Sequence, residues 1–267
     1  MTAFVDIYRS LWRTGVAVQL QYRASGMIWM IGTVLEPTIY LVVWSTVARS
    51  QGGSAGGYAA EDFAAYFILQ MFVSHMTFSW IMHEFQFRIQ QGGFNMLLLR
   101  PVHPIHGDIA ENLAYKVVML VVMVPAAIVL TLLFRPRFEV EPWAAAMFVP
   151  ALVLAFAVRF LFEWCLALAA FWTTRITAVN QTYFAVQAFL SGRIAPIALL
   201  PGGLQTLAGA LPFYWSVAFP VELLLGRLTP EEAWRGLGFQ VLWVGVALAL
   251  LATLWRTAVR RYSAVGA

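Results

Sequence analysis

Long apolar runs separated by short polar segments set the pattern of this 267-residue chain. A helix needs roughly 20 mainly apolar residues to cross a bilayer. Runs of this kind cover residues 26–47, 63–81, 117–134, 143–172, 179–190 and 237–254. The fifth run continues past Ser191–Arg193 as IAPIALLPGG. The pattern therefore predicts an all-α integral membrane protein with six transmembrane helices, and a single transmembrane domain over residues 1–267.

The first 25 residues follow a different pattern. Apolar and aromatic residues alternate there with Arg9, Arg13 and Arg23 at a helical period rather than in a continuous run. Such an amphipathic segment favours a helix in the membrane interface, with its arginines toward anionic lipid headgroups. We expect residues 1–25 to form an interfacial connecting helix.

Composition supports a membrane protein and argues against nucleic-acid binding. The chain is 61% hydrophobic and 11% charged, and its mean hydropathy is +0.75. Its net charge of +4 comes from arginines spread around the ends of the apolar runs, where they direct topology. Ten Lys and Arg residues, including Lys116 and Arg175, fall near the predicted inner side, and six, including Arg193, near the outer side. This bias predicts cytoplasmic termini.

A polar stretch at residues 84–108 interrupts the apolar pattern between the second and third runs. Gly92 and Gly93 break the preceding helix, and Arg100–Pro101 ends a short helix after about one turn. Phe94, Leu97 and Leu98 share one side of this helix, so the segment offers a hydrophobic knob to a partner. An interfacial helix with its leucines in the headgroups is the alternative.

Three charged residues lie within apolar runs. A charged side chain at the bilayer centre costs about 2.5–3.5 kcal/mol on insertion scales, so Glu36 should face protein or a watery cavity. It is either a pathway residue or a carboxyl packed at the kink of Pro37. Arg159 and Glu163 are four residues apart and meet on one helix face. We interpret them as an internal structural pair, with substrate binding as the alternative.

Two short apolar pieces, 204–211 and 213–225, follow the fifth run and are separated and bounded by Pro212, Pro220 and Gly226. Each is too short to cross a bilayer. Because irregular backbone at membrane depth needs protein or water to satisfy it, we expect residues 194–228 to form a re-entrant helical hairpin from the extracellular side.

Three stretches, GGFNMLLLRPVHP, LSGRIAPIALLP and LPFYWSVAFPVELLLGRL, resemble ABC type 2 transporter permease subunits, in a branch long catalogued only as uncharacterised permease components. The resemblance implies a cytoplasmic coupling helix in residues 84–108 that contacts a separate ATPase. Its contact residues would be Gly93, Phe94, Asn95, Leu97, Leu98, Arg100 and Pro101, with a second contact at Arg175. Asn95 stands where the family carries an acidic residue. Together with Glu36, the candidate pathway or gate residues are Arg193, Pro196, Pro212, Phe213 and Pro220.

The function implied by this resemblance is that of a permease subunit in an ABC exporter of hydrophobic or amphipathic cargo. The chain has no Gly-x-x-x-x-Gly-Lys-Ser/Thr motif, so we expect no enzymatic activity and no cofactor on this chain, with ATP and Mg on the partner ATPase. A second permease chain, identical or different, and membrane lipid are the other expected partners, and a bacterial-type inner membrane is the expected location. The alternative is an ion-gradient-driven secondary transporter or channel that titrates Glu36 and the Arg159–Glu163 pair.

Overall fold

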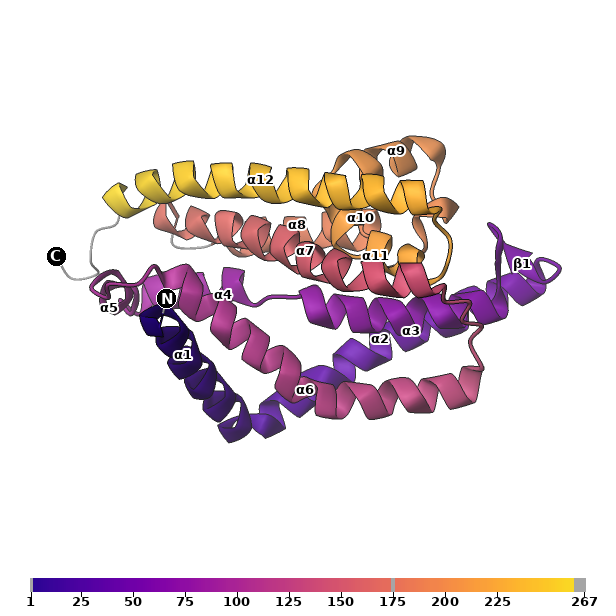
Figure 1. The fold of residues 1–267 in the computed structure, drawn as a ribbon, viewed down its shortest axis with the longest axis horizontal. Coiled ribbons are helices and arrows are strands. Elements are labelled where there is room, and N and C mark those ends of the chain that lie inside the picture. The colour runs from indigo at the N-terminus through magenta and orange to yellow at the C-terminus, as the bar shows by residue number, and fades with distance from the viewer. Residues whose placement is uncertain (1, 174–175, 262–267) are drawn as a thin grey trace.

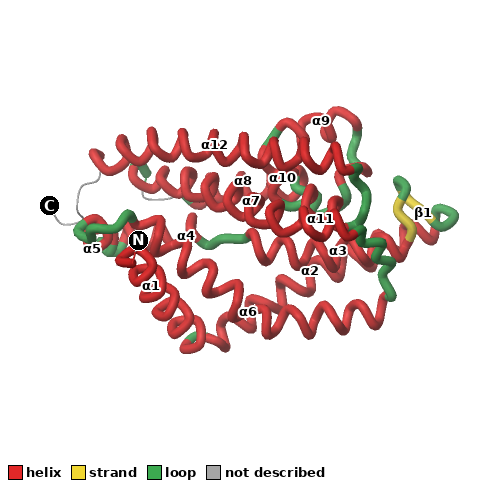
Figure 2. The backbone as a smooth tube through the Cα atoms, in the orientation of Figure 1, coloured by secondary structure: helices red, strands yellow, loops and turns green. Residues whose placement is uncertain are grey.

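Helices make up most of the structure, and short turns connect them (Figures 1 and 2). The computed structural model describes residues 2–173 and 176–261. Its elements are α1 (Thr2–Gln21), α2 (Arg23–Ser50), β1 (Ser54–Ala55), β2 (Tyr58–Ala59), α3 (Ala60–Thr77), α4 (Ile81–Gln90), α5 (Phe94–Leu98), α6 (Pro104–Phe134), α7 (Pro142–Ala167), η1 (Leu168–Phe171), α8 (Thr177–Leu190), η2 (Ile197–Leu199), α9 (Gly202–Ala210), α10 (Pro212–Ser216), α11 (Ala218–Leu224) and α12 (Pro230–Arg261).

Five helical segments of the described chain are long and apolar enough to cross a membrane. They are α2, α3 with α4, α6, α7 with η1, and α12. The predicted fifth span corresponds to α8, which has 14 residues, fewer than the roughly 20 that a crossing needs. This helix stops because Gly192 adopts a left-handed conformation with φ +80°. The all-α membrane fold is confirmed, whereas five segments rather than six have spanning length.

The two ends of the molecule contain different elements. The start of α1, the end of α12 and the short helix α5 gather at one end, and the β1–β2 hairpin lies at the other (Figure 1). The short helices α9, α10 and α11 belong to the predicted re-entrant hairpin of residues 194–228. They lie toward the end of the molecule that carries β1 and β2 (Figure 1). The predicted coupling segment and the predicted re-entrant hairpin therefore lie toward opposite ends.

The N-terminal helix α1 forms where the amphipathic pattern predicts it and packs along the first part of α6. A Cβ at Gly15 would stand 3.0 Å from the Cβ of Ala114, so the two helices approach closely there. Tyr8 and His106 share a hydrogen bond of 2.7 Å between the phenol oxygen and Nδ1. Arg9 and Arg13 are exposed on the other side of α1.

Two large apolar clusters hold the long helices together. The first joins α2, α3 and α6 around the fully buried rings of Phe63, Tyr66 and Phe67. The second joins α4, α7 and α12 around Phe85 and Trp164. Because lipid is as apolar as these side chains, van der Waals packing supplies most of the attraction between helices in a membrane. Interlocking rings are therefore the main contacts of both clusters.

The glycine-rich connector after α2 is more ordered than its composition predicts. Its sequence GGSAGG is typical of a flexible linker, but the structure contains an antiparallel hairpin in which Ser54 pairs with Ala59. Gly56 and Gly57, between the strands, both have positive φ, as a tight hairpin turn requires. The connector therefore contains a short hairpin that its composition does not predict.

Candidate coupling helix and transport pathway

The coupling segment folds as its turn residues predict. Gly92 has φ +70° and reverses the chain after α4, a conformation that costs glycine little because it has no Cβ. Gly93 then forms the N-cap of α5. The helix ends at Leu98, and Pro101 follows three residues later, where it prevents the helix from continuing.

The shared apolar side of α5 faces into the protein. Phe94 is fully buried, with its ring centroid 5.3 Å from that of Phe85 and 5.0 Å from that of Phe171. Leu97 and Leu98 are half-buried against the same cluster. The prediction of an exposed knob is therefore wrong for Phe94. The spacing groups the three residues on one side, but it does not tell which side meets the core.

The opposite side of α5 and the residues after it are open. Met96 and Leu99 are 65% and 81% exposed, and Arg100 is exposed beside them. Asn95 is half-buried at the edge of the helix. The surface available to a partner thus consists of two long apolar side chains and a cation. Arg175, the predicted second contact, lies outside the described residues.

Aromatic rings connect Phe94 to the ends of three long segments. Phe85 belongs to α4, Phe171 to η1, and Trp255 to α12. Trp164 of α7 lies 4.9 Å from Phe85 and 5.3 Å from Trp255 between ring centroids. Closely packed interiors transmit displacement because they contain few voids. Phe94 of α5 is therefore joined by ring contacts, directly or through Phe85, to α4, α7, η1 and α12.

His103 caps the helix that follows. Its Nδ1 accepts a hydrogen bond from the backbone amide of Ile105 at 3.3 Å, and its ring lies 4.4 Å from that of Trp255. Burial lowers the pKa of the His103 imidazole below its ordinary value of 6.5. A neutral ring agrees with the cap, because Nδ1 accepts a hydrogen bond only when it carries no proton.

The second span is interrupted within its length. α3 ends at Thr77 and α4 begins at Ile81, and the carbonyl of Phe78 between them accepts a 2.6 Å hydrogen bond from Lys116 Nζ. Lys116 is 1% exposed and also donates to the side-chain oxygen of Asn112. Broken backbone is tolerated there only where protein or water satisfies it. Lys116 therefore lies within α6, the third spanning segment, rather than just before its predicted start at residue 117.

Arg159 and Glu163 of α7 form an ion pair next to this break. Arg159 Nε donates to Glu163 Oε1 at 2.8 Å, and the two side chains are 3% and 0% exposed. Arg159 also donates to the hydroxyl of Thr77, while the hydroxyls of Ser79 and Tyr183 donate to Glu163. The i, i+4 spacing places the two charges together as expected, and residues from the break and from α8 complete their hydrogen bonds.

A cavity of about 430 Å³, which we name the basic cavity, opens beside the break. Its lining includes Glu36, Gln70, Arg159 and Arg193. Arg193 Nη2 lies 2.5 Å from Glu36 Oε2, and the two side chains are about one third exposed. Glu36 thus faces a cavity within the protein rather than lipid alone. The sequence marks both residues as pathway candidates, but it does not predict that they form an ion pair with each other.

The loop that carries Arg193 is fixed on three sides. The hydroxyl of Tyr66 donates to the carbonyl of Gly192 at 2.8 Å, and Trp44 Nε1 donates to the carbonyl of Ile194 at 2.8 Å. A Cβ at Gly192 would stand 2.4 Å from the Tyr66 hydroxyl oxygen and 2.9 Å from the Cβ of Ala218. Only glycine fits this position, and the tight fit holds Arg193 against α2.

The remaining predicted gate residues lie elsewhere. Pro196 precedes η2, Pro212 begins α10, and Pro220 is buried in α11. Phe213 is half-buried, with its ring 5.8 Å from that of Tyr183. None of these four lines the basic cavity. Among the described residues, the predicted pathway residues therefore fall into two groups. Glu36 and Arg193 line the basic cavity, and the other four lie between residues 194 and 228, outside that cavity.

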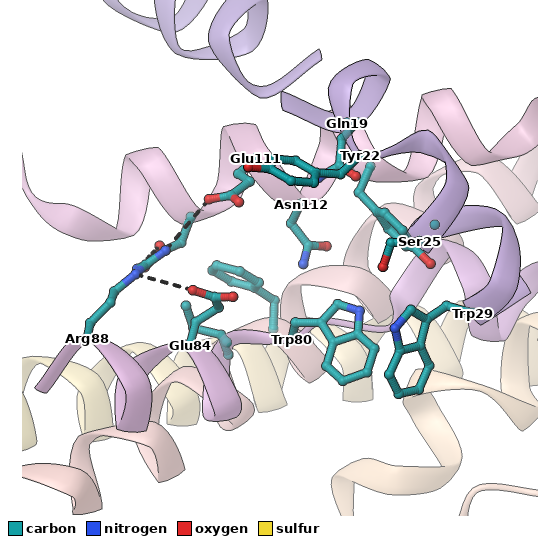
Figure 3. A pocket seen from close by; sticks show the side chains of 14 residues that line it. Gln19, Tyr22, Ser25, Trp29, Trp80, Glu84, Arg88, Glu111 and Asn112 are labelled. Atoms are coloured by element: carbon teal, nitrogen blue, oxygen red, sulfur yellow. Dashed lines mark hydrogen bonds and ion pairs between the residues drawn. The ribbon is translucent and has the colours of Figure 1, made fainter. Parts of the chain in front are cut away.

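A second cavity, of about 280 Å³, adjoins the first and carries the opposite charge; we name it the acidic cavity (Figure 3). Arg88 is its cation, and the nearest nitrogen–oxygen distances are 2.5 Å to Asp108, 3.6 Å to Glu84 and 3.6 Å to Glu111. Three carboxylates thus surround one guanidinium. Within the described ranges, no three His, Cys, Asp or Glu side chains form a group that could hold a metal ion.

Two tryptophans separate the cavities. Trp29 of α2 and Trp80, next to the start of α4, line both of them. Their ring centroids are 4.7 Å apart at an interplanar angle of 72°, and Figure 3 shows the two rings side by side. Tyr115 of α6 also lines both cavities. The acidic and basic cavities therefore lie in series, with an edge-to-face aromatic pair between them.

Several residues in or next to these cavities were not anticipated from the sequence. Lys116 and Glu111 were placed before the third span, which was expected to begin at residue 117. The helix in fact begins at Pro104. Proline is favoured at the first position of a helix, so His103–Pro104 was a usable signal for the earlier start. The Trp29–Trp80 contact has no comparable signal, because 50 intervening residues separate the two rings.

The long apolar helices define a multi-pass membrane protein. A family model described as ABC-2 family transporter protein matches residues 34–266. The chain belongs to this family, which confirms the resemblance seen in the three sequence stretches. It is accordingly a permease component of an ABC transporter, and membership of the family implies association with an ABC ATPase. No curated protein matches the chain.

Proposed function

We propose that the chain is the permease subunit of an ABC exporter that moves a hydrophobic or amphipathic substrate out across a bacterial-type plasma membrane. A separate ATPase, which binds ATP and Mg, supplies the energy and docks on α5 from the cytoplasm. In this arrangement the termini are cytoplasmic, and the hairpin of α9, α10 and α11 lies toward the outer side as a gate.

The observation that carries this proposal is the two-sided construction of α5. Met96 and Leu99 are exposed on one side, where a partner would bind. Phe94 on the other side is enclosed by rings that belong to α4, η1 and α12. A helix that merely floated in the lipid headgroups would not need this buried anchor. The construction suits a lever that receives movement from a partner and passes it to the spans.

A second permease chain completes the transporter in this proposal. The side of α2 that is open within the single chain carries exposed Ile28, Ile31, Leu35 and Ile39. The second span is a poorer candidate, because α3 is mostly buried inside the chain and has little surface left for a partner. We therefore assign the contact to α2 and α8. An identical and a different second chain both fit this surface.

The test replaces the exposed side of α5 and leaves its buried anchor intact. We expect Leu99→Asp to abolish co-purification of the ATPase and the ATP hydrolysis of the complex, because a carboxylate replaces the apolar contact. Val140→Asp is the matched control: Val140 is also exposed, at 44%, but lies in the loop between α6 and α7. If both variants keep the ATPase, α5 is not the docking site.

The buried charges of α6 and α7 favour a second candidate, an ion-gradient-driven transporter. Lys116, Arg159 and Glu163 surround a broken helix, as in secondary transporters whose ion sites lie at discontinuous helices. That function requires transport by the chain alone in proteoliposomes, driven by a proton gradient. Transport that needs the ATPase and ATP, and is unaffected by dissipating the gradient, rejects this candidate.

A further inference from the structure

We propose that the basic cavity binds the headgroup of an anionic amphiphile, a molecule with an apolar tail and a phosphate group. This inference rests on the proposed function and deepens it, because it assigns the charge of the cargo and the place where the headgroup binds. The cavity volume of about 430 Å³ falls within the range of ordinary ligand sites, roughly 300–1,000 Å³.

The balance of charge in and behind the cavity selects an anion. Arg159 and Arg193 line the cavity, and Glu36 is the carboxylate beside them. Behind the lining, Glu163 pairs with Arg159, and Lys116 is buried close by with the carbonyl of Phe78 as an acceptor. The lining itself therefore holds two guanidinium groups and one carboxylate. At low dielectric an uncompensated charge interacts strongly with its surroundings, so one additional negative group would complete the site.

A buried amide supplies the second indication of a ligand. Gln70 lines the cavity and is 1% exposed. Its Nε2 donates to the hydroxyl of Ser74 at 2.8 Å, but its Oε1 has no hydrogen-bond partner among the described residues. Buried polar atoms are rarely left unpaired. A phosphate monoester that carries one proton has both a P–OH donor for this oxygen and negative oxygens for the arginines.

The rest of the lining suits the apolar part of such a molecule. Trp29, Phe78, Trp80 and Phe184 supply aromatic walls. The rings lie beside the side of α2 that is open in the single chain, where Ile28 and other apolar residues are exposed. A headgroup at the arginines therefore leaves its first methylene groups among rings, and its tail has a route along apolar side chains.

Glu36 occupies the place that the anion would take. Its carboxylate is bonded to Arg193, and because both side chains are about one third exposed the contact is open to exchange. An incoming phosphate would compete with this internal carboxylate for the guanidinium. Removing Arg193 and removing Glu36 should then have opposite effects on affinity. A purely structural ion pair would lead to impairment by both changes.

The experiment titrates the purified full-length chain in dodecyl maltoside and follows tryptophan fluorescence, since Trp29 and Trp80 line the cavity. The probes are dodecyl phosphate and dodecyltrimethylammonium, which share a tail and differ in headgroup charge. We expect the phosphate to bind and the ammonium compound not to bind. Arg193→Gln should weaken phosphate binding about tenfold, as for loss of one charge-assisted contact. Glu36→Gln should tighten it.

Two further variants keep the outcome interpretable. Arg193→Lys retains the charge and should preserve part of the affinity even if Arg193→Gln folds poorly. Arg235→Gln is the matched control, because Arg235 also lies 2.5 Å from a carboxylate, that of Glu231, but on the exposed start of α12. Equal binding of the two probes overturns the proposal. So does an affinity that falls in both Glu36→Gln and Arg193→Gln, or changes in neither.

The binding measurement is independent of the docking test. It uses the permease chain without the ATPase, and Leu99→Asp should leave dodecyl phosphate binding unchanged. If Leu99→Asp abolishes ATPase docking but the phosphate does not bind, the proposed function stands and the assignment of the cargo fails. If the phosphate binds but the ATPase does not dock on α5, the assignment of the cargo stands and the proposed function fails.

Discussion

The basic and acidic cavities are neighbours of similar construction that hold their charge in different ways. In the acidic cavity one arginine faces three carboxylates, and Glu84 and Glu111 are each 48% exposed, so solvent screens their surplus charge. In the basic cavity the surplus is positive, and Lys116 and Arg159 are almost completely buried. Their charge is therefore not screened by solvent, and only the protein groups around it can offset it. The comparison teaches that burial, rather than the number of charged residues, decides how much each ion pair contributes to the stability of the fold.

The largest expected effect comes from breaking the buried pair of the basic cavity. Arg159→Met leaves Glu163 without its cation and should lower the free energy of unfolding by about 3–5 kcal/mol. The double variant Arg159→Met/Glu163→Leu should be less destabilised than Arg159→Met, because no orphan charge remains. Denaturant unfolding of the purified chain in dodecyl maltoside measures both. A double variant as unstable as the sum of the two single ones contradicts the account.

The equivalent change in the acidic cavity should cost less. Arg88→Met removes the cation from three carboxylates, yet Asp108 keeps the hydrogen bond that Trp164 donates to it at 3.0 Å. We expect a loss of about 1.5–3 kcal/mol, the range for a hydrogen bond to a charged group, measured by the same unfolding experiment. If Arg88→Met is as damaging as Arg159→Met, solvent screening does not distinguish the two cavities.

The aromatic pair between the cavities should contribute a smaller amount. Trp29→Ala removes an edge-to-face contact with Trp80, an arrangement worth about 0.5–1.5 kcal/mol beyond the area it buries. Trp234→Ala is the control, since Trp234 is 67% exposed near the start of α12. The difference between the two variants in unfolding free energy measures the pair. Equal losses would mean that the Trp29–Trp80 contact adds nothing.

The smallest expected effect is a dependence on pH near the acidic cavity. The pKa of His103 is lowered in the folded chain mainly by burial, with His106 acting in the same direction and Asp108 opposing it. The unfolded chain therefore takes up this proton at higher pH, so stability falls as the pH drops from about 6.5 through the lowered pKa. His103→Asn keeps a capping oxygen without the titration. Its melting temperature should vary less between pH 7 and pH 5 than that of the parent chain.

Much of the fold follows from the sequence, because continuous apolar runs leave few other structures at membrane depth. The exception is α8, where a single glycine with positive φ ends the helix before it reaches spanning length. Hydrophobicity alone does not reveal this. The β1–β2 hairpin was missed for a related reason, since glycine composition is typical both of flexible linkers and of tight turns.

The candidate site was less predictable, and the reason is distance along the chain. Arg159 and Glu163 are four residues apart, so helical geometry alone brings them together. Glu36 and Arg193 are 157 residues apart, and their contact depends on the packing of the loop after α8. Phe94 shows a third limit. Periodicity places it with Leu97 and Leu98 on one side of α5, but only the surrounding rings decide that this side is buried.

The central claim is that the exposed side of α5 receives the ATPase, and site-specific photo-crosslinking tests it most directly. p-Benzoylphenylalanine placed at Leu99 in the assembled transporter should crosslink to the ATPase subunit, identified by mass spectrometry of the product. The same group placed at Val140 should not crosslink to it. An ATPase captured from Val140 but not from Leu99, in a complex that hydrolyses ATP, would contradict the account.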